Sequence, residues 1–173
     1  SALRLLDRPR EALLSFEKAI ASDANNAMAY FNQGNTLKQL NRLDEALSSY
    51  QVSDLISSRH VPCIYNLANT YRDLGRFSEA LESYDRALSL EPDSAEVNWN
   101  KSLLLLLQGN YAEGWPLYEW RLKRDELSAD YPQFQQPLWR GETELSGKRL
   151  LIHVEQGLGD MVQFCRFVPG LVS

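Results

Sequence analysis

The sequence predicts an all-α protein of antiparallel helix pairs, followed by a short segment of a different kind. It resembles itself at an offset of 34 residues, places small and aromatic residues at fixed points of each copy, and carries turn-forming residues between its helical stretches. Residues that match at this offset include Asn66 and Asn100, Gly75 and Gly109, and Tyr84 and Tyr118. Because self-similarity at a fixed period is typical of helical-repeat arrays, we expect one helix pair per copy.

The repeated part covers residues 1–124. Its predicted units are a partial repeat at 1–26 and repeats at 27–60, 61–94 and 95–124. Gly75 and Gly109 fall where the two helices of a pair should turn, since glycine adopts the left-handed conformation without strain.

The end of one helix and the start of the next are predicted between the third and fourth of these units. Pro92 cannot continue the preceding helix. Asp93 followed by Glu96 has the spacing of a capping box, which predicts the N-terminus of the next helix.

The repeat resembles the tetratricopeptide-repeat (TPR) family, whose period is 34. The residues that the family prefers are clearest in the middle repeat, at Ala68, Tyr71, Phe77, Ala80, Tyr84, Ala87 and Pro92. The resemblance implies a right-handed superhelix in which the first helix of each pair lines the concave side. The last repeat departs from the pattern at Gly114, Pro116 and Arg121, which indicates the end of the array.

Composition restricts the class of partner. The net charge is −5, from 18 basic and 23 acidic residues, so we expect no nucleic acid partner. No apolar run approaches the length of a membrane helix, and no secretory signal opens the sequence, which predicts a cytoplasmic protein. Cys63 and Cys165 lie far apart without metal-ligand spacing, so we expect reduced thiols, no metal and no cofactor.

The candidate binding residues follow a period of 3.6 along the first helix of each pair. They are Phe31, Asn32, Asn35, Tyr65, Asn66, Asn69, Arg72, Trp99 and Asn100. An asparagine amide offers a donor and an acceptor, which suits the backbone of an extended peptide. The repeated asparagines also resemble the ladder inside O-linked N-acetylglucosamine transferases, which is implied to bind protein substrates. In the alternative interpretation the asparagines join neighbouring helices and the aromatic residues pack.

After residue 124 the pattern changes. Residues 125–147 have no helical period and predict a linker. Residues 148–154 are an apolar run of strand length, residues 155–160 (EQGLGD) predict a turn, and residues 161–172 return to helical spacing. This order predicts the first strand, loop and helix of a truncated α/β domain at 148–173.

The same stretch resembles the start of bacterial heptosyltransferase-like glycosyltransferases, which have two Rossmann-like halves. The resemblance rests on the Gly159-Asp160 pair after the predicted strand and on Pro169 in the following helix. It implies that Asp160 is the general base that deprotonates an acceptor hydroxyl; the alternative is an N-cap. The half that would hold a nucleotide sugar is missing, so we expect no enzymatic activity from this chain by itself.

Three functions follow. The first is a module that binds an extended peptide or protein in a concave groove. The alternative is the acceptor-recognition arm of a glycosyltransferase, and a third possibility is a scaffold without a catalytic partner. The apolar C-terminal segment predicts either self-association or folding back over Trp99, Leu103, Leu106 and Leu107.

Overall fold

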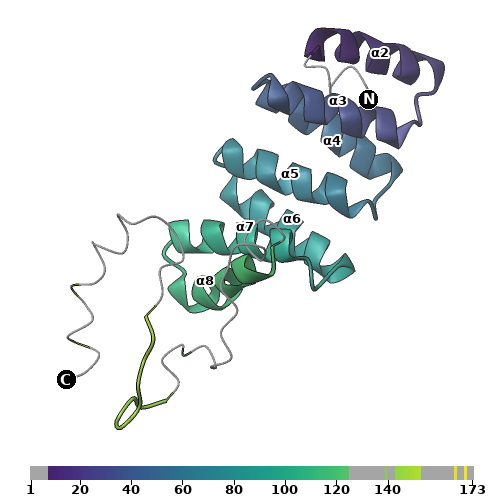
Figure 1. Ribbon diagram of the computed structural model, residues 1–173. Helices are drawn as coiled ribbons and strands as arrows, with labels where there is room; N and C mark the ends of the chain where they lie inside the picture. The colour runs from purple at the N-terminus through teal and green to yellow at the C-terminus, as the bar shows by residue number, and fades with distance from the viewer. Residues whose placement is uncertain (1–7, 125–138, 140–142, 153–165, 167–169, 171–173) are drawn as a thin grey trace. The chain divides into compact units, whose positions relative to one another are not determined.

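The computed structural model describes residues 8–124, 139, 143–152, 166 and 170. The chain divides into two units, residues 1–125 and 126–173, and each is considered by itself. The described part of the first unit holds seven α-helices and one 3-10 helix (Figure 1). They are α2 (Pro9–Ser22), α3 (Ala27–Gln39), α4 (Leu43–Ile56), α5 (Val61–Asp73), α6 (Phe77–Leu90), α7 (Ala95–Leu107), α8 (Tyr111–Tyr118) and η1 (Glu119–Lys123).

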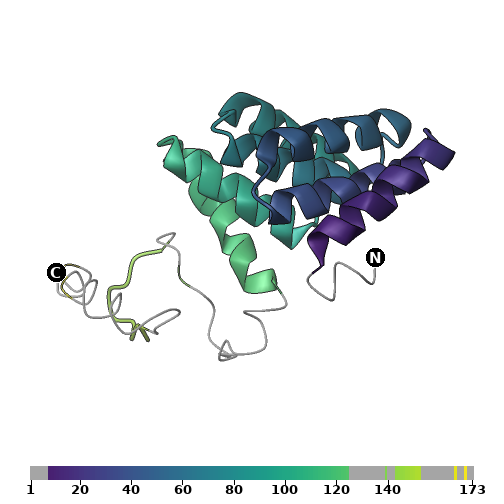
Figure 2. The same cartoon turned by 90° about the horizontal axis from the view of Figure 1, so that it is seen from above.

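The predicted helix pairs are confirmed. The first helices α3, α5 and α7 begin at residues 27, 61 and 95, and the second helices α4, α6 and α8 begin at 43, 77 and 111, so both series have a spacing of 34. Residues 27–122 are all described and contain no strand. Figure 2 shows that α2 and the green end of the array run in different directions, so the direction of the helices changes along the array.

The turn inside each pair is built the same way three times. Asn41, Gly75 and Gly109 have φ of 58°, 75° and 80°, each one residue after a helix C-cap. In the middle turn the N–H of Gly75 donates to the carbonyl of Arg72 at 2.9 Å, and the N–H of Arg76 donates to that of Tyr71 at 2.9 Å. These two bonds form a Schellman motif, which satisfies the last carbonyls of the first helix.

The predicted capping box at the start of α7 is wrong. The N-cap is Ser94, and no side chain caps this helix terminus. Glu96 instead interacts with Asn100 and with Arg124. The carboxylate therefore points along the first helix, where these two side chains offer donors, and does not reach back to the N-cap.

Small and aromatic side chains hold each pair together. Ala46 and Ala80 are fully buried, as are the rings of Tyr50 and Tyr84. A Cβ built at Gly34 would lie 2.6 Å from Cε1 of Tyr50, so only glycine lets the ring pack this closely against α3. The core of the array is thus formed where the second helix of each pair meets the first.

The array ends differently from its middle. Pro116 lies inside α8, which is only 8 residues long, and η1 follows directly and contacts α7. A Cβ at Gly114 would lie 2.7 Å from Cδ2 of Leu106, so the last pair is also closely packed. Leu107 remains 69% exposed.

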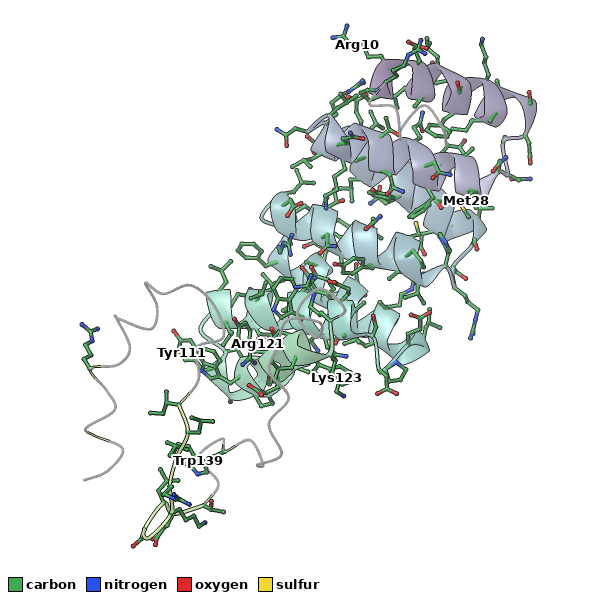
Figure 3. All side chains as sticks on the ribbon, in the orientation of Figure 1. Arg10, Met28, Tyr111, Arg121, Lys123 and Trp139 are labelled. Atoms are coloured by element: carbon green, nitrogen blue, oxygen red, sulfur yellow. The ribbon has the colours of Figure 1, made fainter. Side chains whose placement is uncertain are left out.

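In the second unit the structure corrects the predicted strand. Residues 148–152 are described, and none belongs to a strand. A strand needs a neighbour to pair its N–H and C=O groups, and the described residues of this unit supply none. The Nε1–H of Trp139, labelled in Figure 3, donates to the carbonyl of Thr143 at 2.8 Å, and Lys148 closes a turn onto Leu145. Residues 153 and 154, the predicted loop with Asp160, and the following helix except for two isolated positions lie outside the described residues.

Candidate peptide-binding face

The predicted binding residues all lie on the first helices. Phe31, Asn32 and Asn35 are on α3, Tyr65, Asn66, Asn69 and Arg72 are on α5, and Trp99 and Asn100 are on α7. Helix α5 contacts both α3 and α7, which places the three helices side by side. We call the surface defined by these residues the first-helix face.

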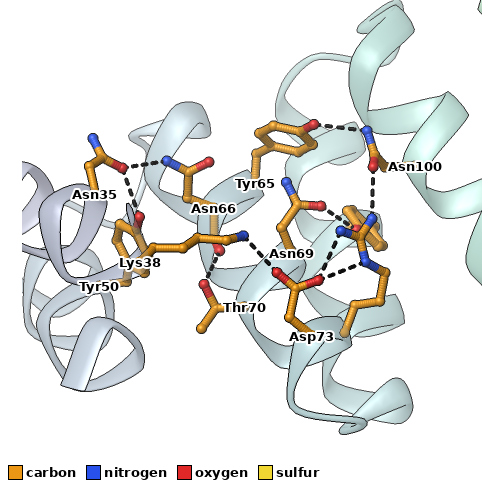
Figure 4. A network of polar contacts seen from close by, with 11 residues as sticks. Asn35, Lys38, Tyr50, Tyr65, Asn66, Asn69, Thr70, Asp73 and Asn100 are labelled. Carbon is orange, nitrogen blue, oxygen red and sulfur yellow. Dashed lines mark hydrogen bonds and ion pairs between the residues drawn. The ribbon is translucent and has the colours of Figure 1, made fainter. Parts of the chain in front are cut away.

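Asn35 connects two helix pairs. Its Oδ1 accepts a hydrogen bond from the hydroxyl of Tyr50 at 2.7 Å and a second from Nδ2 of Asn66 at 2.7 Å (Figure 4). The first bond joins α3 to α4 within a pair, and the second joins α3 to α5 in the next pair. The same intra-pair bond recurs one repeat later, where Tyr84 donates to Oδ1 of Asn69 at 2.6 Å.

Asn100 makes the equivalent connection between α5 and α7. Its Nδ2 donates to the hydroxyl of Tyr65 at 2.8 Å, and its Oδ1 accepts from Nη1 of Arg72 at 2.8 Å. Nδ2 also donates to the carbonyl of Glu96 within α7 at 2.9 Å. Asn100 is buried, and both ends of its amide are paired.

An ion-pair chain extends this network toward α3. Arg72 contacts Oδ1 of Asp73 at 3.0 Å, and Nζ of Lys38 lies 3.1 Å from Oδ2 of the same carboxylate (Figure 4). Lys38 and Arg72 occupy the same position in successive repeats. Asp73 therefore ties two neighbouring first helices together through one carboxylate.

The joining role that was the alternative for the asparagines is thus present in Asn35, Asn66, Asn69 and Asn100. Sequence reasoning missed the tyrosine partners. The signal was available, because Asn35 and Tyr50 have the same separation as Asn69 and Tyr84, at a repeat distance of 34. A polar residue that keeps a fixed distance from an aromatic hydroxyl in each repeat indicates such a bond.

Several of the amides have one end without a partner among the described residues. Nδ2 of Asn32 donates to the carbonyl of Met28 in its own helix at 2.9 Å, and Nδ2 of Asn66 donates to Oδ1 of Asn35. No described residue donates to Oδ1 of Asn32 or Asn66, and none accepts from Nδ2 of Asn35. Asn69 differs, because its side chain also has a hydrogen-bond contact with the Tyr65 hydroxyl. These O and N positions follow from the hydrogen-bond pattern.

Phe31 and Tyr65 of the first-helix face pack against other aromatic rings. Phe31 lies 6.2 Å from the ring of Tyr50 and makes an edge contact of 4.8 Å with His60. Tyr65 lies 6.5 Å from Tyr84. Both residues border the hydrophobic core. Packing therefore uses part of each ring.

Burial holds the tyrosines in their hydroxyl form. It raises the pKa of Tyr84, and it raises the pKa of Tyr65 as well. Both hydroxyls therefore stay protonated to a higher pH than the hydroxyl of an exposed tyrosine. The Tyr84 hydroxyl is accordingly a permanent donor to Asn69.

Two other kinds of site are not found in the described part of the chain. No group of three or more His, Cys, Asp or Glu side chains is placed to hold a metal ion there. Nor is any described helix both long and apolar enough to cross a membrane.

The comparisons with known proteins agree with the observed helix pairs. Residues 15–48 and 61–94 each match a model of the tetratricopeptide repeat. Over 83 residues the chain is 41% identical to Protein FlbA of Caulobacter vibrioides (strain ATCC 19089 / CIP 103742 / CB 15). That match covers 47% of this chain and only 13% of the relative, so most of the relative has no counterpart here.

Solved structures support the same fold. A crystal structure of MamA has a TM-score of 0.67 at 21% identity, and covers 75% of each chain. A tetratricopeptide repeat protein from Parabacteroides merdae has a TM-score of 0.66 at 23% identity, and covers 72% of this chain and 50% of that one. These matches confirm that the chain contains tetratricopeptide repeats. Neither family match extends beyond residue 94, and none of these findings supports a fused glycosyltransferase domain.

Proposed function

Because the chain carries tetratricopeptide repeats, we propose that it is a protein-binding module whose first-helix face receives an extended peptide. The observation that carries the proposal is the set of half-paired amides on α3 and α5. Asn32 and Asn66, which are related by the repeat, offer acceptors, while Asn35 offers a donor.

The chemistry of an extended peptide matches this pattern. Its backbone presents N–H groups that need acceptors and C=O groups that need donors. Asn32 and Asn35 on α3 can meet one of each, and Asn66 repeats the acceptor on α5. Recognition of this kind depends on the peptide backbone more than on its side chains.

The internal hydrogen bonds assist such binding. Asn35 fixes the amide of Asn66, and Tyr84 fixes that of Asn69. A fixed amide loses little side-chain entropy when a ligand binds, which favours affinity. The structural role and the binding role of these residues are therefore compatible.

The proposal is tested with peptides selected from a phage-displayed random library. Asn32→Ala combined with Asn66→Ala should weaken binding of the selected peptides by about tenfold, as expected for about two lost net hydrogen bonds. Ser48→Ala is the matched control, since the Ser48 hydroxyl bonds only within the exposed side of α4. Selected peptides that bind the double variant as tightly as the unmodified chain would contradict the proposal.

N-methylation of the peptide backbone sharpens the test. Methylation removes peptide N–H donors without changing the side chains. It should weaken binding to the unmodified chain and have little effect on the double variant, which has already lost the acceptors. Equal sensitivity in both proteins would place the backbone contacts elsewhere.

The acceptor-recognition arm remains the second candidate function. It is supported by the sequence alone, through the GLGD stretch that ends at Asp160. In that function the first-helix face would deliver an acceptor protein and Asp160 would take the hydroxyl proton. The test is sugar transfer by a polypeptide in which this sequence continues into a complete glycosyltransferase domain. Transfer that is unaffected by Asp160→Asn would exclude Asp160 as the base.

A further inference from the structure

Arg124 contacts the first-helix face of its own chain. It follows η1, and its guanidinium carbon lies 3.9 Å from the centroid of the Trp99 ring on α7. Its Nε donates to Oε1 of Glu96 on the same helix at 2.8 Å. One arginine side chain is thus held by an aromatic face and a carboxylate together.

The contact of Arg124 with Trp99 differs from the cation–π contacts that Arg121 and Lys123 make. Arg121 lies over Tyr118 at 4.6 Å, and Lys123 lies over Trp120 at 3.7 Å. Both of these contacts join residues three positions apart at the end of the array. Arg124 reaches a residue of a different helix, on the surface that we propose to bind peptides.

Glu96 has a second partner besides Arg124. Nδ2 of Asn100 lies 3.4 Å from Oε2 of Glu96, whereas Arg124 donates to Oε1 of the same carboxylate. Asn100 is itself fixed by Tyr65 and Arg72. The carboxylate therefore keeps a partner when Arg124 leaves.

An arginine side chain is the ligand that these groups recognise best. A planar guanidinium can stack on an indole ring and donate to a carboxylate at the same time, whereas a lysine ammonium makes a point contact. Hydrogen bonds in which both groups are charged are also stronger than neutral ones.

We propose that Glu96 and Trp99 form a binding site for an arginine side chain of a partner peptide, which Arg124 occupies as an internal ligand. The inference rests on the proposed function and adds the chemistry of one ligand residue. Arg124 has φ of −77° and ψ of 137°, which is extended backbone beyond the last helical turn. Its side chain can leave Trp99 without the unwinding of a helix.

Occupation by Arg124 sets the affinity for the partner. A peptide arginine must compete with a group that is already in place, so its apparent affinity falls by the fraction of time that the site is closed. Removal of Arg124 should therefore increase affinity. A residue with a purely structural role would not produce this gain.

The experiment uses blocked pentapeptides of sequence Gly-Gly-Arg-Gly-Gly and the same peptide with citrulline, which keeps the shape but lacks the charge. Binding is followed by the NMR signal of the Trp99 indole N–H, assigned with Trp99→Phe. Arg124→Ala and Arg124→Gln should bind the arginine peptide about fivefold more tightly than the unmodified chain. The citrulline peptide should show no such gain, and adding Glu96→Gln to Arg124→Ala should remove it.

Lys123→Ala is the matched control, because it removes the adjacent cation over Trp120 and leaves the Glu96 and Trp99 site closed. Circular dichroism melting reports whether each variant is folded. Two folded Arg124 variants that bind the arginine peptide no more tightly than the unmodified chain would overturn the inference. If the Asn32→Ala and Asn66→Ala variant still loses selected peptides in that case, the proposed function survives without the arginine site.

Discussion

The hydroxyl of Tyr84 donates a 2.6 Å hydrogen bond to Oδ1 of Asn69, at a place where both residues are buried. One repeat earlier, Tyr50 makes the same bond to Asn35, whose oxygen also accepts from Asn66. The repeat therefore conserves a tie between the two helices of a pair. The two repeats differ in the number of donors to the asparagine oxygen, since Asn35 also accepts from Asn66.

Tyr84→Phe should destabilise the array more than Tyr50→Phe does. The first change leaves the buried oxygen of Asn69 without its donor, at a cost of about 1–3 kcal/mol. The second leaves Asn35 with the bond from Asn66, so its cost should be about 1 kcal/mol. Urea denaturation measures both free energies of unfolding. Tyr111→Phe, at an exposed ring, is the control, and an equal loss from all three changes would contradict the shared-acceptor argument.

Replacing Asn100 by alanine should destabilise the array more than replacing Asn66 by alanine. Asn100→Ala removes the partner of both Tyr65 and Arg72 from a buried position and should cost about 2 kcal/mol or more. Asn66→Ala removes one bond at a half-buried position and should cost about 1 kcal/mol or less. Thermal melting at neutral pH measures the difference. A larger loss from Asn66→Ala would show that the α3 and α5 connection carries more of the stability.

The turns inside the second and third helix pairs could be predicted because each has a local cause. Gly75 and Gly109 mark the turn inside a pair, and the repeat distance places the other helices. Asn41 was harder to recognise, since only its position in the repeat distinguishes it from other asparagines. In the structure it has the left-handed conformation that the two glycines adopt.

The partners of the candidate residues could not be predicted in the same way. Which hydroxyl reaches Asn35, and whether Glu96 turns toward a helix terminus or toward Arg124, depends on how the helices cross. The sequence period states which residues share a face, but not the distances across it. The strand predicted from residue 148 onward failed for a related reason. An apolar run of strand length specifies a strand only when a partner is beside it.

Gly34→Ala should destabilise the first full pair despite the better helix propensity of alanine. The new Cβ would meet Cε1 and Cδ1 of the buried Tyr50 ring at 2.6 and 2.7 Å, and the enclosed ring has little room to move. We expect a net loss of about 1–3 kcal/mol from overpacking. Gly114→Ala is the comparison, because its Cβ would meet the side chain of Leu106, which is only partly buried and can rotate. A stabilised Gly34→Ala variant would contradict the close packing.

Stability should fall at alkaline pH because burial raises the pKa of several acids, of which Cys63 and Tyr84 are the most buried. Burial raises the pKa of the Cys63 thiol above its ordinary value of 9.0 and that of Tyr84 above 10.0. Above those ordinary values the unfolded chain loses protons that the folded chain retains, so the free energy of unfolding decreases as pH rises. The contribution is complete below pH 9 and is lost progressively above it. Urea denaturation between pH 7 and pH 11 should show this slope, and Cys63→Ala with Tyr84→Phe should flatten it, whereas Tyr111→Phe should not.

The apolar run near the C-terminus should cause self-association. Leu150, Leu151 and Ile152 are 37%, 66% and 54% exposed, and adjacent exposed apolar side chains favour contact with a second copy. Light scattering should therefore give a mass that rises with concentration for the whole chain. Leu151→Asp with Ile152→Asp, or a chain that stops at Arg124, should remain monomeric, because the contact surface is then charged or missing. A whole chain that is monomeric at all concentrations, with a tail that resists protease, would instead support folding back onto the array.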